Sequence, residues 1–392
     1  MGYAVAKSLA ARGHRIVCAA ARVPTMPGRL DGVLGEVAYP DPFIEPDRFV
    51  ATIRDAARSW SVDAIFPVHE ETFVLARHRE SLGGAPLIAP TFRALLAAHD
   101  KLASYALARE LAIDAPLTRS AASRAELRDA ANEVGFPAIL KPRFGSGANK
   151  VRRLRSAEDV DPAVRSWDDG PSQPMLVQRF RAGVGVGYGG LVWKGALRAG
   201  AGHVRLREVP IAGGTSTARR TFHHPRIAKA ARALLERSGL DGVGMVEFRY
   251  DRGSDSFAFL EINPRYWGGV PTAIESGVDI PALHLAYATG APAASAEVVT
   301  PSREIESRWV LGELRAVVGL ASAGEYGRLA GVFQRDARAG LAFDDVSAND
   351  PWAFFHQMAA YAAGLVKHGS FGGHSSEKDA FFLREIMGSS AS

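Results

Sequence analysis

The chain has 392 residues, of which 47% are hydrophobic and 23% are charged, so its composition fits an ordinary folded protein of two or three domains. The formal net charge of +5 is scattered along the sequence, which favours small anionic substrates over nucleic acid. A single cysteine, Cys18, excludes an internal disulfide and a cysteine-based metal cluster. No apolar run approaches the roughly 20 residues of a membrane span, and no signal-peptide pattern opens the chain, so we expect a cytoplasmic protein without a membrane partner.

Residues 1–92 alternate between helical and strand patterns. Helices are expected at 2–13, 47–60 and 71–82, and strands at 15–20, 36–39, 64–68 and 86–90. Such alternation predicts a small parallel sheet covered by helices, with Cys18 in a buried strand. Because a doubly wound domain normally opens with a strand and a Gly-rich turn, we expect a first strand upstream of Met1.

The middle of the chain is expected to form two further units. One helix is predicted over 91–113, followed by strands at 137–143 and 151–155 that flank the loop "FGSGANK". A strand at 175–180, a Gly-rich hairpin at 182–197 and a helix at 225–239 come next. We divide this part into 93–175 and 176–300, and expect residues 301–392 to be a mostly helical extension.

The stretch "GVGMVEFRYD" and the stretch "FAFLEINPR" are joined by "RGSD", whose turn-forming residues predict a hairpin. Folding about this turn brings Glu247 opposite Glu261. Strand alternation places Leu260 and Ile262 on one face of the second strand, and Phe259, Glu261 and Asn263 on the other.

Two carboxylates held about 5 Å apart on paired strands repel by roughly 3 kcal/mol at an effective dielectric near 20. A cation between them would remove this cost, and Mg²⁺ prefers oxygen ligands of the kind that Glu247, Glu261 and Asn263 supply. The alternative is a solvated sheet face without a ligand.

Lys141 ends an apolar strand and is followed by a Gly-Ser-Gly loop. Glycines allow backbone N–H groups to approach phosphate oxygens, and a lysine supplies countercharge. The spacing is not that of a Walker loop, and two glycines in a hairpin also occur in simple turns. Lys101 lies in the predicted helix 91–113, where a solvated surface lysine is the alternative.

The order of these motifs resembles the signature of the ATP-grasp superfamily over about residues 60–300: Lys101, the lysine and Gly-rich hairpin at 141–151, "LVQRF" at 176–180, and then "VEF" and "LEINPR". The segments "HVRLREVPIAGGTST", "LEINPRYWGGVPTAIESGVDIPAL" and "DDVSANDP" resemble those of bacterial carboligases of the D-aspartate ligase and carbamoyl-phosphate synthase kind. The resemblance implies an α/β architecture with a two-lobed ATP-grasp fold behind the N-terminal sheet.

The resemblance also implies roles for individual residues. Lys101 and Lys141 would reach the ATP phosphates. Lys141 would also lie near the adenine ring and would be a catalytic residue. The flap over the phosphates would be Gly145, Ser146 and Gly147, and the adenine hinge Gln178, Arg179 and Phe180. Arg179 departs from the acidic residue common at its position, which puts side-chain recognition there in doubt.

One or two Mg²⁺ ions, which Mn²⁺ can replace, would bind Glu247, Glu261 and Asn263 by the same resemblance. Arg265 would be the catalytic residue at the reacting carboxyl, with a structural salt bridge as its alternative.

A separate set of residues in the stretch 203–214 could form a substrate cradle: His203, Arg205, Arg207, Glu208, Gly213 and Gly214. Alternation puts residues 203, 205 and 207 on one face, although a solvated basic edge strand would look similar. Glu70 or Glu71 follows a strand of the first sheet, where open sheets bind ligands, and could touch an amine substrate.

These observations predict an ATP- and Mg²⁺-dependent ligase that joins a small carboxylate to an amine through an acyl phosphate. A phosphotransferase or carbamoyl-phosphate-type enzyme would use the same residues, and a non-catalytic ATP-binding protein is a third reading. Nucleic acid is not an expected partner. Family members are often dimers, so the resemblance also allows a homodimer.

Overall fold

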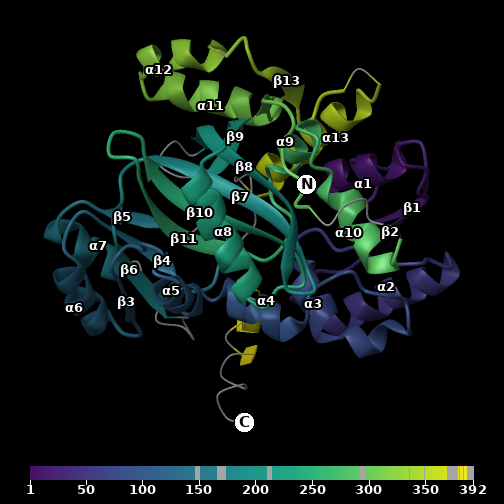
Figure 1. Ribbon diagram of the computed structural model, residues 1–392, viewed down its shortest axis with the longest axis horizontal. Helices are drawn as coiled ribbons and strands as arrows, with labels where there is room; N and C mark the ends of the chain where they lie inside the picture. The colour runs from purple at the N-terminus through teal and green to yellow at the C-terminus, as the bar shows by residue number, and fades with distance from the viewer. Residues whose placement is uncertain are drawn as a thin grey trace.

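The computed structural model describes residues 1–145, 151–165, 174–209, 214–291, 297–334, 336–347, 349–368, 378, 380–382 and 384–385. These residues form a mixed α/β architecture with sheets of two, four and seven strands. The N-terminal region and the four-stranded sheet lie on opposite sides of the seven-stranded sheet (Figure 1).

The N-terminal region contains a parallel pair of strands, β1 (Ile16–Ala20) and β2 (Val33–Ala38). Its helices are α1 (Gly2–Ala10), α2 (Pro46–Ser59) and α3 (Glu71–Arg77), with a short 3₁₀ helix η1 (Arg79–Leu82). The strands predicted at 64–68 and 86–90 are reduced to one parallel bridge between Ile65 and Leu87. Prolines at 67, 86 and 90 explain the reduction, because proline cannot donate a ladder hydrogen bond.

The four-stranded sheet has the order β3 (Thr118–Ala121), β6 (Met175–Arg179), β4 (Ala138–Pro142) and β5 (Arg152–Leu154). One face of it packs against α6 (Arg124–Val134), α7 (Val160–Arg165) and η2 (Ala157–Asp159). The predicted division at 175/176 separated β6 from this sheet. Its hydrogen bonds to β3 and β4 show instead that β6 belongs with the strands before it.

The seven-stranded sheet is the centre of the molecule. Its strands, in spatial order, are β11 (Ser256–Asn263), β10 (Gly242–Asp251), β7 (Val184–Trp193), β8 (Ala196–Val209), β9 (Thr215–Thr221), β12 (Ile305–Arg308) and β13 (Gly340–Phe343). All neighbouring pairs are antiparallel except β12 and β13. Residues 301–392 are therefore not only a helical extension, because they add two strands to this sheet.

Helices surround the large sheet. They are α4 (Phe92–His99), α5 (Lys101–Glu110), α8 (Pro225–Arg237), α9 (Val270–Glu275), α10 (Ile280–Thr289), α11 (Val310–Ser322), α12 (Tyr326–Ala330), η3 (Gly331–Phe333) and α13 (Trp352–His368). Their starts follow local chemistry: Asp279 caps α10, and His224 caps α8 just before Pro225. Within the described part of the chain, every helix is too short or too polar to cross a lipid bilayer.

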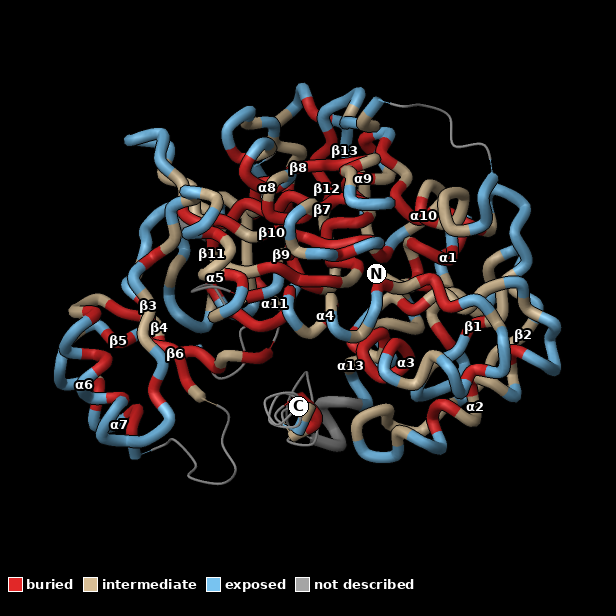
Figure 2. The backbone as a smooth tube through the Cα atoms, turned by 60° about the horizontal axis from the view of Figure 1, so that its bottom comes forward, coloured by how far each residue is buried: buried red, intermediate tan, exposed pale blue. Residues whose placement is uncertain are grey.

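One hydrophobic core joins the N-terminal region to the large sheet. It contains Phe49 and Phe73 of the N-terminal helices, Leu95 of α4, and Phe248 and Phe259 of β10 and β11, all fully buried. Buried residues run through the strands of the large sheet and through most of α3 (Figure 2). Because one core spans these elements, the N-terminal helices are fixed relative to the sheet.

Strand β7 presents three alternating glycines, Gly185, Gly187 and Gly189, to one face of the large sheet. A methyl group on Gly189 would lie 1.9 Å from the ring of Trp267, and one on Gly187 would lie 2.5 Å from His203. The bare strand therefore allows side chains from neighbouring elements to lie flat on the sheet.

Replacing Gly189 by alanine should destabilise the protein by about 1–3 kcal/mol, because the buried Trp267 ring would have to move. The matched control is Gly319→Ala at an exposed position of helix α11, where nothing lies within 4 Å and where alanine should be neutral or stabilise by up to about 1 kcal/mol. Urea unfolding of both variants measures the difference. Equal stability of the two variants would contradict the close approach.

Candidate functional site

The two acidic residues of the hairpin face each other across paired strands, as predicted. Glu247 of β10 is the register partner of Glu261 of β11. On the other side of β10, Glu247 is followed in register by Gly187 of β7 and then by His203 of β8. A row across four strands thus places both carboxylates and His203 on one face of the sheet.

The alternation expected along β11 is interrupted by a β-bulge at Leu260. Glu247 pairs with Glu261, but the next residue, Phe248, pairs with Phe259, so Leu260 has no register partner. The extra residue changes the phase of the strand. Phe259 therefore packs in the same core as Ile262, and the prediction that Phe259 shares the face of Glu261 is wrong.

Lys101 reaches the carboxylates from the first position of a helix. The single helix predicted over 91–113 is divided at Asp100, whose side chain accepts a hydrogen bond from the backbone N–H of Leu102 and caps α5. Lys101 is only 5% exposed, so it is not a surface lysine. Its Nζ lies 3.5 Å from Glu261 and donates to the carbonyl of Gly145 at 2.9 Å.

Lys141 comes to the same place from the four-stranded sheet. Its Nζ donates to the hydroxyl of Tyr105 at 2.7 Å, and the Tyr105 hydroxyl donates to the carbonyl of the bulged Leu260 at 2.7 Å. Burial lowers the pKa of Lys141 to about 8, although Glu261 and Glu247 act to raise it.

Burial and neighbouring charges act differently on the two carboxylates. Burial raises the pKa of Glu247, against the opposing effect of Arg205, whose Nη2 lies 2.7 Å away. Burial also tends to raise the pKa of Glu261, but the charges of Lys101 and Lys141 outweigh this effect and lower the pKa to about 2. Asn263 donates from its amide to Glu247 at 3.2 Å and to Glu261 at 3.3 Å.

The protein itself therefore supplies cations beside both carboxylates, so repulsion alone does not require a metal. Among the described residues, no group of three or more His, Cys, Asp or Glu side chains is placed to hold a metal ion. The expected set differs from such a cluster, since it combines two carboxylates with an amide.

The flap and hinge residues are only partly described. Gly145 has φ +142°, a backbone conformation that favours glycine, while Ser146 and Gly147 lie outside the described residues. In the hinge, Gln178 is buried and donates to Thr118 at 2.9 Å. The backbone N–H groups of Arg179 and Phe180 donate to the carbonyls of Leu117 and Pro137, so a nucleotide would compete for them.

The substrate cradle is divided by the structure. Arg205 contacts Glu208 at 3.0 Å and the carbonyl of Gly214 at 3.4 Å, in addition to Glu247. Arg207 is not on their side: it forms a bidentate ion pair with Glu313 of α11. Register shifts on either side of Arg207 explain why simple alternation misplaced it, and Gly213 lies outside the described residues.

His203 is 5% exposed and lies beside Gly187 and Gly269. Burial lowers its pKa well below the usual value, and the nearby Arg219 and Arg205 act in the same direction. His203 is therefore neutral near pH 7.

Arg265 lies just beyond β11, where its Nε is 3.3 Å from Glu70 and its Nη1 donates to the carbonyl of Tyr266. Of the two acids considered after the 64–68 segment, Glu70 reaches the site, whereas Glu71 accepts hydrogen bonds from the backbone of residues 68 and 69.

Reasoning from the sequence residue by residue missed Tyr105, Arg219 and Lys378. Of these three, only Arg219 could have been found from strand alternation, because it is the register partner of Arg205 across β8 and β9.

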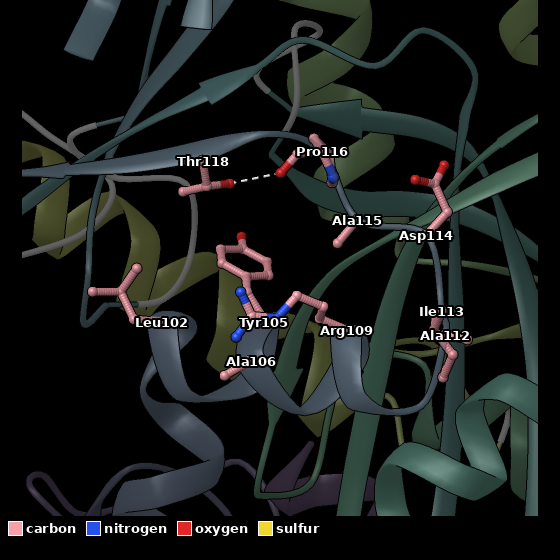
Figure 3. A pocket seen from close by; sticks show the side chains of 10 residues that line it. All are labelled: Leu102, Tyr105, Ala106, Arg109, Ala112, Ile113, Asp114, Ala115, Pro116 and Thr118. Atoms are coloured by element: carbon pink, nitrogen blue, oxygen red, sulfur yellow. Dashed lines mark hydrogen bonds between the residues drawn. The ribbon is translucent and has the colours of Figure 1, made fainter. Parts of the chain in front are cut away.

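Beside Tyr105 the surface is hollowed to a volume of about 560 Å³ between α5 and the segment 112–118. The Tyr105 ring rises from α5 toward the chain at Pro116 and Thr118, while Arg109 and Asp114 line the same hollow (Figure 3). Tyr105 thus both lines this hollow and accepts a hydrogen bond from the buried Lys141.

A family model described as "ATP-grasp in the biosynthetic pathway with Ter operon" matches residues 197–312, which include β8 to β12 and both carboxylates. The chain is 28% identical over 278 residues to the large chain of carbamoyl phosphate synthase from Rubrobacter xylanophilus, covering 67% of this chain and 24% of that protein. It is 29% identical over 175 residues to acetyl-CoA carboxylase from Schizosaccharomyces pombe, covering 41% of this chain and 8% of the relative. The chain thus spans a quarter or less of these curated relatives.

Solved structures share the arrangement of elements. Biotin carboxylase from Campylobacter jejuni superimposes with a TM-score of 0.65 at 16% identity, covering 77% of this chain and 71% of that one. Residues 197–312 therefore match an ATP-grasp domain. L-amino acid ligase from Bacillus licheniformis superimposes with a TM-score of 0.60 at 17% identity, covering 76% and 75%. The predicted α/β fold class and the ATP-grasp resemblance are confirmed.

Lys141 should titrate near pH 8 and not near the usual 10.5, because burial disfavours its charged form. Glu261→Gln should lower this pKa further, since Glu261 favours the ammonium. Carbon-13 NMR of lysine Cε, with Lys141→Arg for assignment, measures both values. Titration of Lys141 at its usual pH would show that the ammonium is solvated.

Proposed function

We propose that the chain is an ATP- and Mg²⁺-dependent carboxylate–amine ligase that acts through an acyl phosphate. The observation that supports it most is the meeting of three separate elements at one point. Lys101 comes from α5, Lys141 from the four-stranded sheet, and the facing pair of Glu247 and Glu261 from the large sheet.

The two lysines suit the phosphates of ATP. Both are less than 10% exposed, so their charges are little screened by water. The Lys101 ammonium also holds the carbonyl of Gly145, where the Gly-rich loop begins. A triphosphate between these lysines would gain charge-assisted hydrogen bonds.

The donor set at the hairpin suits a hard divalent cation. Glu247 and Glu261 provide carboxylate oxygens, and Asn263 provides an amide that would have to turn its oxygen toward the ion, since its nitrogen now faces both acids. When bound, Mg²⁺ supplies positive charge that offsets the charge spreading over phosphate oxygens during transfer.

The chemistry follows from what a carboxylate needs before an amine can react with it. The carboxylate oxygen attacks the γ-phosphorus of ATP, so that a new O–P bond forms as the bond to ADP breaks. The amine nitrogen then attacks the acyl carbon, inorganic phosphate leaves, and the nitrogen loses a proton. Arg265 would hold the carboxylate first and the oxyanion of the tetrahedral intermediate afterwards, using its fork of donors.

The relatives support this class of reaction. The Campylobacter biotin carboxylase is described as a β-γ-ATP complex, and the Bacillus protein is named an L-amino acid ligase. On this basis we propose an amino acid or a similar small acid as the carboxylate, and a cytoplasmic setting in which ATP and Mg²⁺ are plentiful.

A hydroxylamine-trapping screen tests the proposal. Panels of amino acids and small carboxylic acids are incubated with the protein, MgATP and hydroxylamine, and the hydroxamate and ADP are quantified by mass spectrometry. A ligase should form hydroxamate with at least one acid, in equal amount to ADP. ADP with a phosphorylated acid that hydroxylamine does not consume would indicate a phosphotransferase, and nucleotide binding without any ADP would indicate a non-catalytic protein.

Glu261→Gln should lower hydroxamate formation by about 100-fold or more, because it removes a carboxylate from the cation site without changing side-chain size. MgADP affinity should weaken with it, whereas the circular dichroism spectrum should not change. The control is Glu133→Gln, which removes a carboxylate of a surface pair with Arg119. Normal turnover by Glu261→Gln would rule out the metal assignment.

A further inference from the structure

A second charged cluster lies beside Arg265. Its centre is Glu70, whose side chain is only 8% exposed. One carboxylate oxygen faces the Arg265 Nε at 3.3 Å. The other faces the Lys378 Nζ at 3.0 Å and the His69 Nδ1 at 2.8 Å. These partners outweigh burial and hold the pKa of Glu70 well below its usual range.

Lys378 reaches this cluster from near the C-terminal end of the chain, on a segment anchored by two phenylalanines. Phe382 is fully buried, with ring-centre distances of 4.9 Å to Phe73 and 4.8 Å to His99. Phe381 is 5% exposed and lies 5.5 Å from Phe43. The described residues of this segment lie beside α4 (Figure 1, yellow).

The same anchor touches the ATP-binding half of the proposed site. Phe382 stacks on Phe144 with 6.2 Å between the ring centres. Phe144 directly precedes Gly145, whose carbonyl accepts a hydrogen bond from Lys101. The segment therefore connects the N-terminal region, the base of the Gly-rich loop and Glu70. Such contacts fix the position of the Lys378 ammonium relative to Arg265.

Charge decides what Lys378 does. Glu70 and Arg265 alone would cancel, and a buried carboxylate would then stand beside the place where the substrate carboxylate must bind. Among the described residues, Lys378 and Arg265 then face Glu70 as two permanent cations, with the His69 ring as a third contact, so these groups together carry a net positive charge. His99 adds no charge near pH 7, because burial lowers its pKa to about 3.

We propose that Lys378 is a positioning residue that neutralises Glu70 and so leaves Arg265 free to attract the carboxylate substrate. This inference rests on the proposed ligase function, because it assigns the carboxylate end of that site. It adds a requirement that the ATP-grasp motifs do not contain: the carboxylate pocket is completed by the C-terminal segment.

The test compares three variants in the hydroxamate assay, with the acid that the wild type uses best. Lys378→Met should raise the KM for that acid about tenfold or more, with kcat within about twofold and MgADP affinity unchanged. Lys378→Arg should have the KM of the wild type, because arginine keeps the positive charge. Glu385→Gln is the matched control: it breaks the 2.9 Å pair with Arg77 on the same segment, away from Glu70, and should leave the KM unchanged.

Three results would overturn the proposal. An unchanged KM in Lys378→Met would show that the charge does not matter. An equal rise in Glu385→Gln would show that the segment acts only through docking. A lower KM for hydroxylamine in Lys378→Met would show that Lys378 occupies the place of the amine.

A bromide soak tests the role of Lys378 independently of the proposed ligase function, because the soak does not require the protein to turn over a substrate. Bromide is used as a small anion, and its anomalous signal is measured beside Arg265 in crystals of the wild type and of Lys378→Met. We expect an ordered bromide in the wild type and none in the variant. Equal signals, or no signal in either, would overturn the role of Lys378 even if the ligase assay succeeds, and the expected difference would support it even if that assay fails.

Discussion

The site depends on the mutual neutralisation of buried charges. Glu247 and Glu261 lie in register on neighbouring strands, where water cannot fully screen them, and Arg205, Lys101 and Lys141 compensate them. Loss of one partner in such a cluster leaves a buried charge uncompensated, which typically costs 3–5 kcal/mol. The large sheet, the four-stranded sheet and α5 must therefore meet correctly before the site exists, and the fold and its proposed chemistry share one electrostatic requirement.

The sequence was most informative where structure is set by residues close together in the chain. A turn-rich "RGSD" between two apolar stretches predicted the hairpin, and the pairing of Glu247 with Glu261 followed from it. The same reasoning failed where one residue changed the phase. The bulge at Leu260 turned Phe259 into the core, and Asp100 ended one helix and began the next. Periodicity cannot detect such a change, since it assumes an unbroken repeat.

Contacts between distant parts of the chain were beyond the reach of pattern reasoning. Arg207 was expected beside Arg205, but Glu313 of α11 binds it more than 100 residues away. Glu70 and Lys378 are separated by more than 300 residues, and no local repeat marks either as part of a pair. The strands β12 and β13 lie in a stretch that reads as helical, and they become strands because an edge of the large sheet is available to them.

The three glycines of β7, Gly185, Gly187 and Gly189, give the sheet a flat surface on which side chains from other elements lie. Since this strand contributes no side chains there, the chemical character of the surface is decided by β8 and β10, its two neighbours. If the proposed function holds, a descendant of this chain could acquire a different substrate by exchanging residues on those two strands, while β7 keeps its glycines. Sequence changes would then be concentrated on β8 and β10, and β7 between them would stay unchanged.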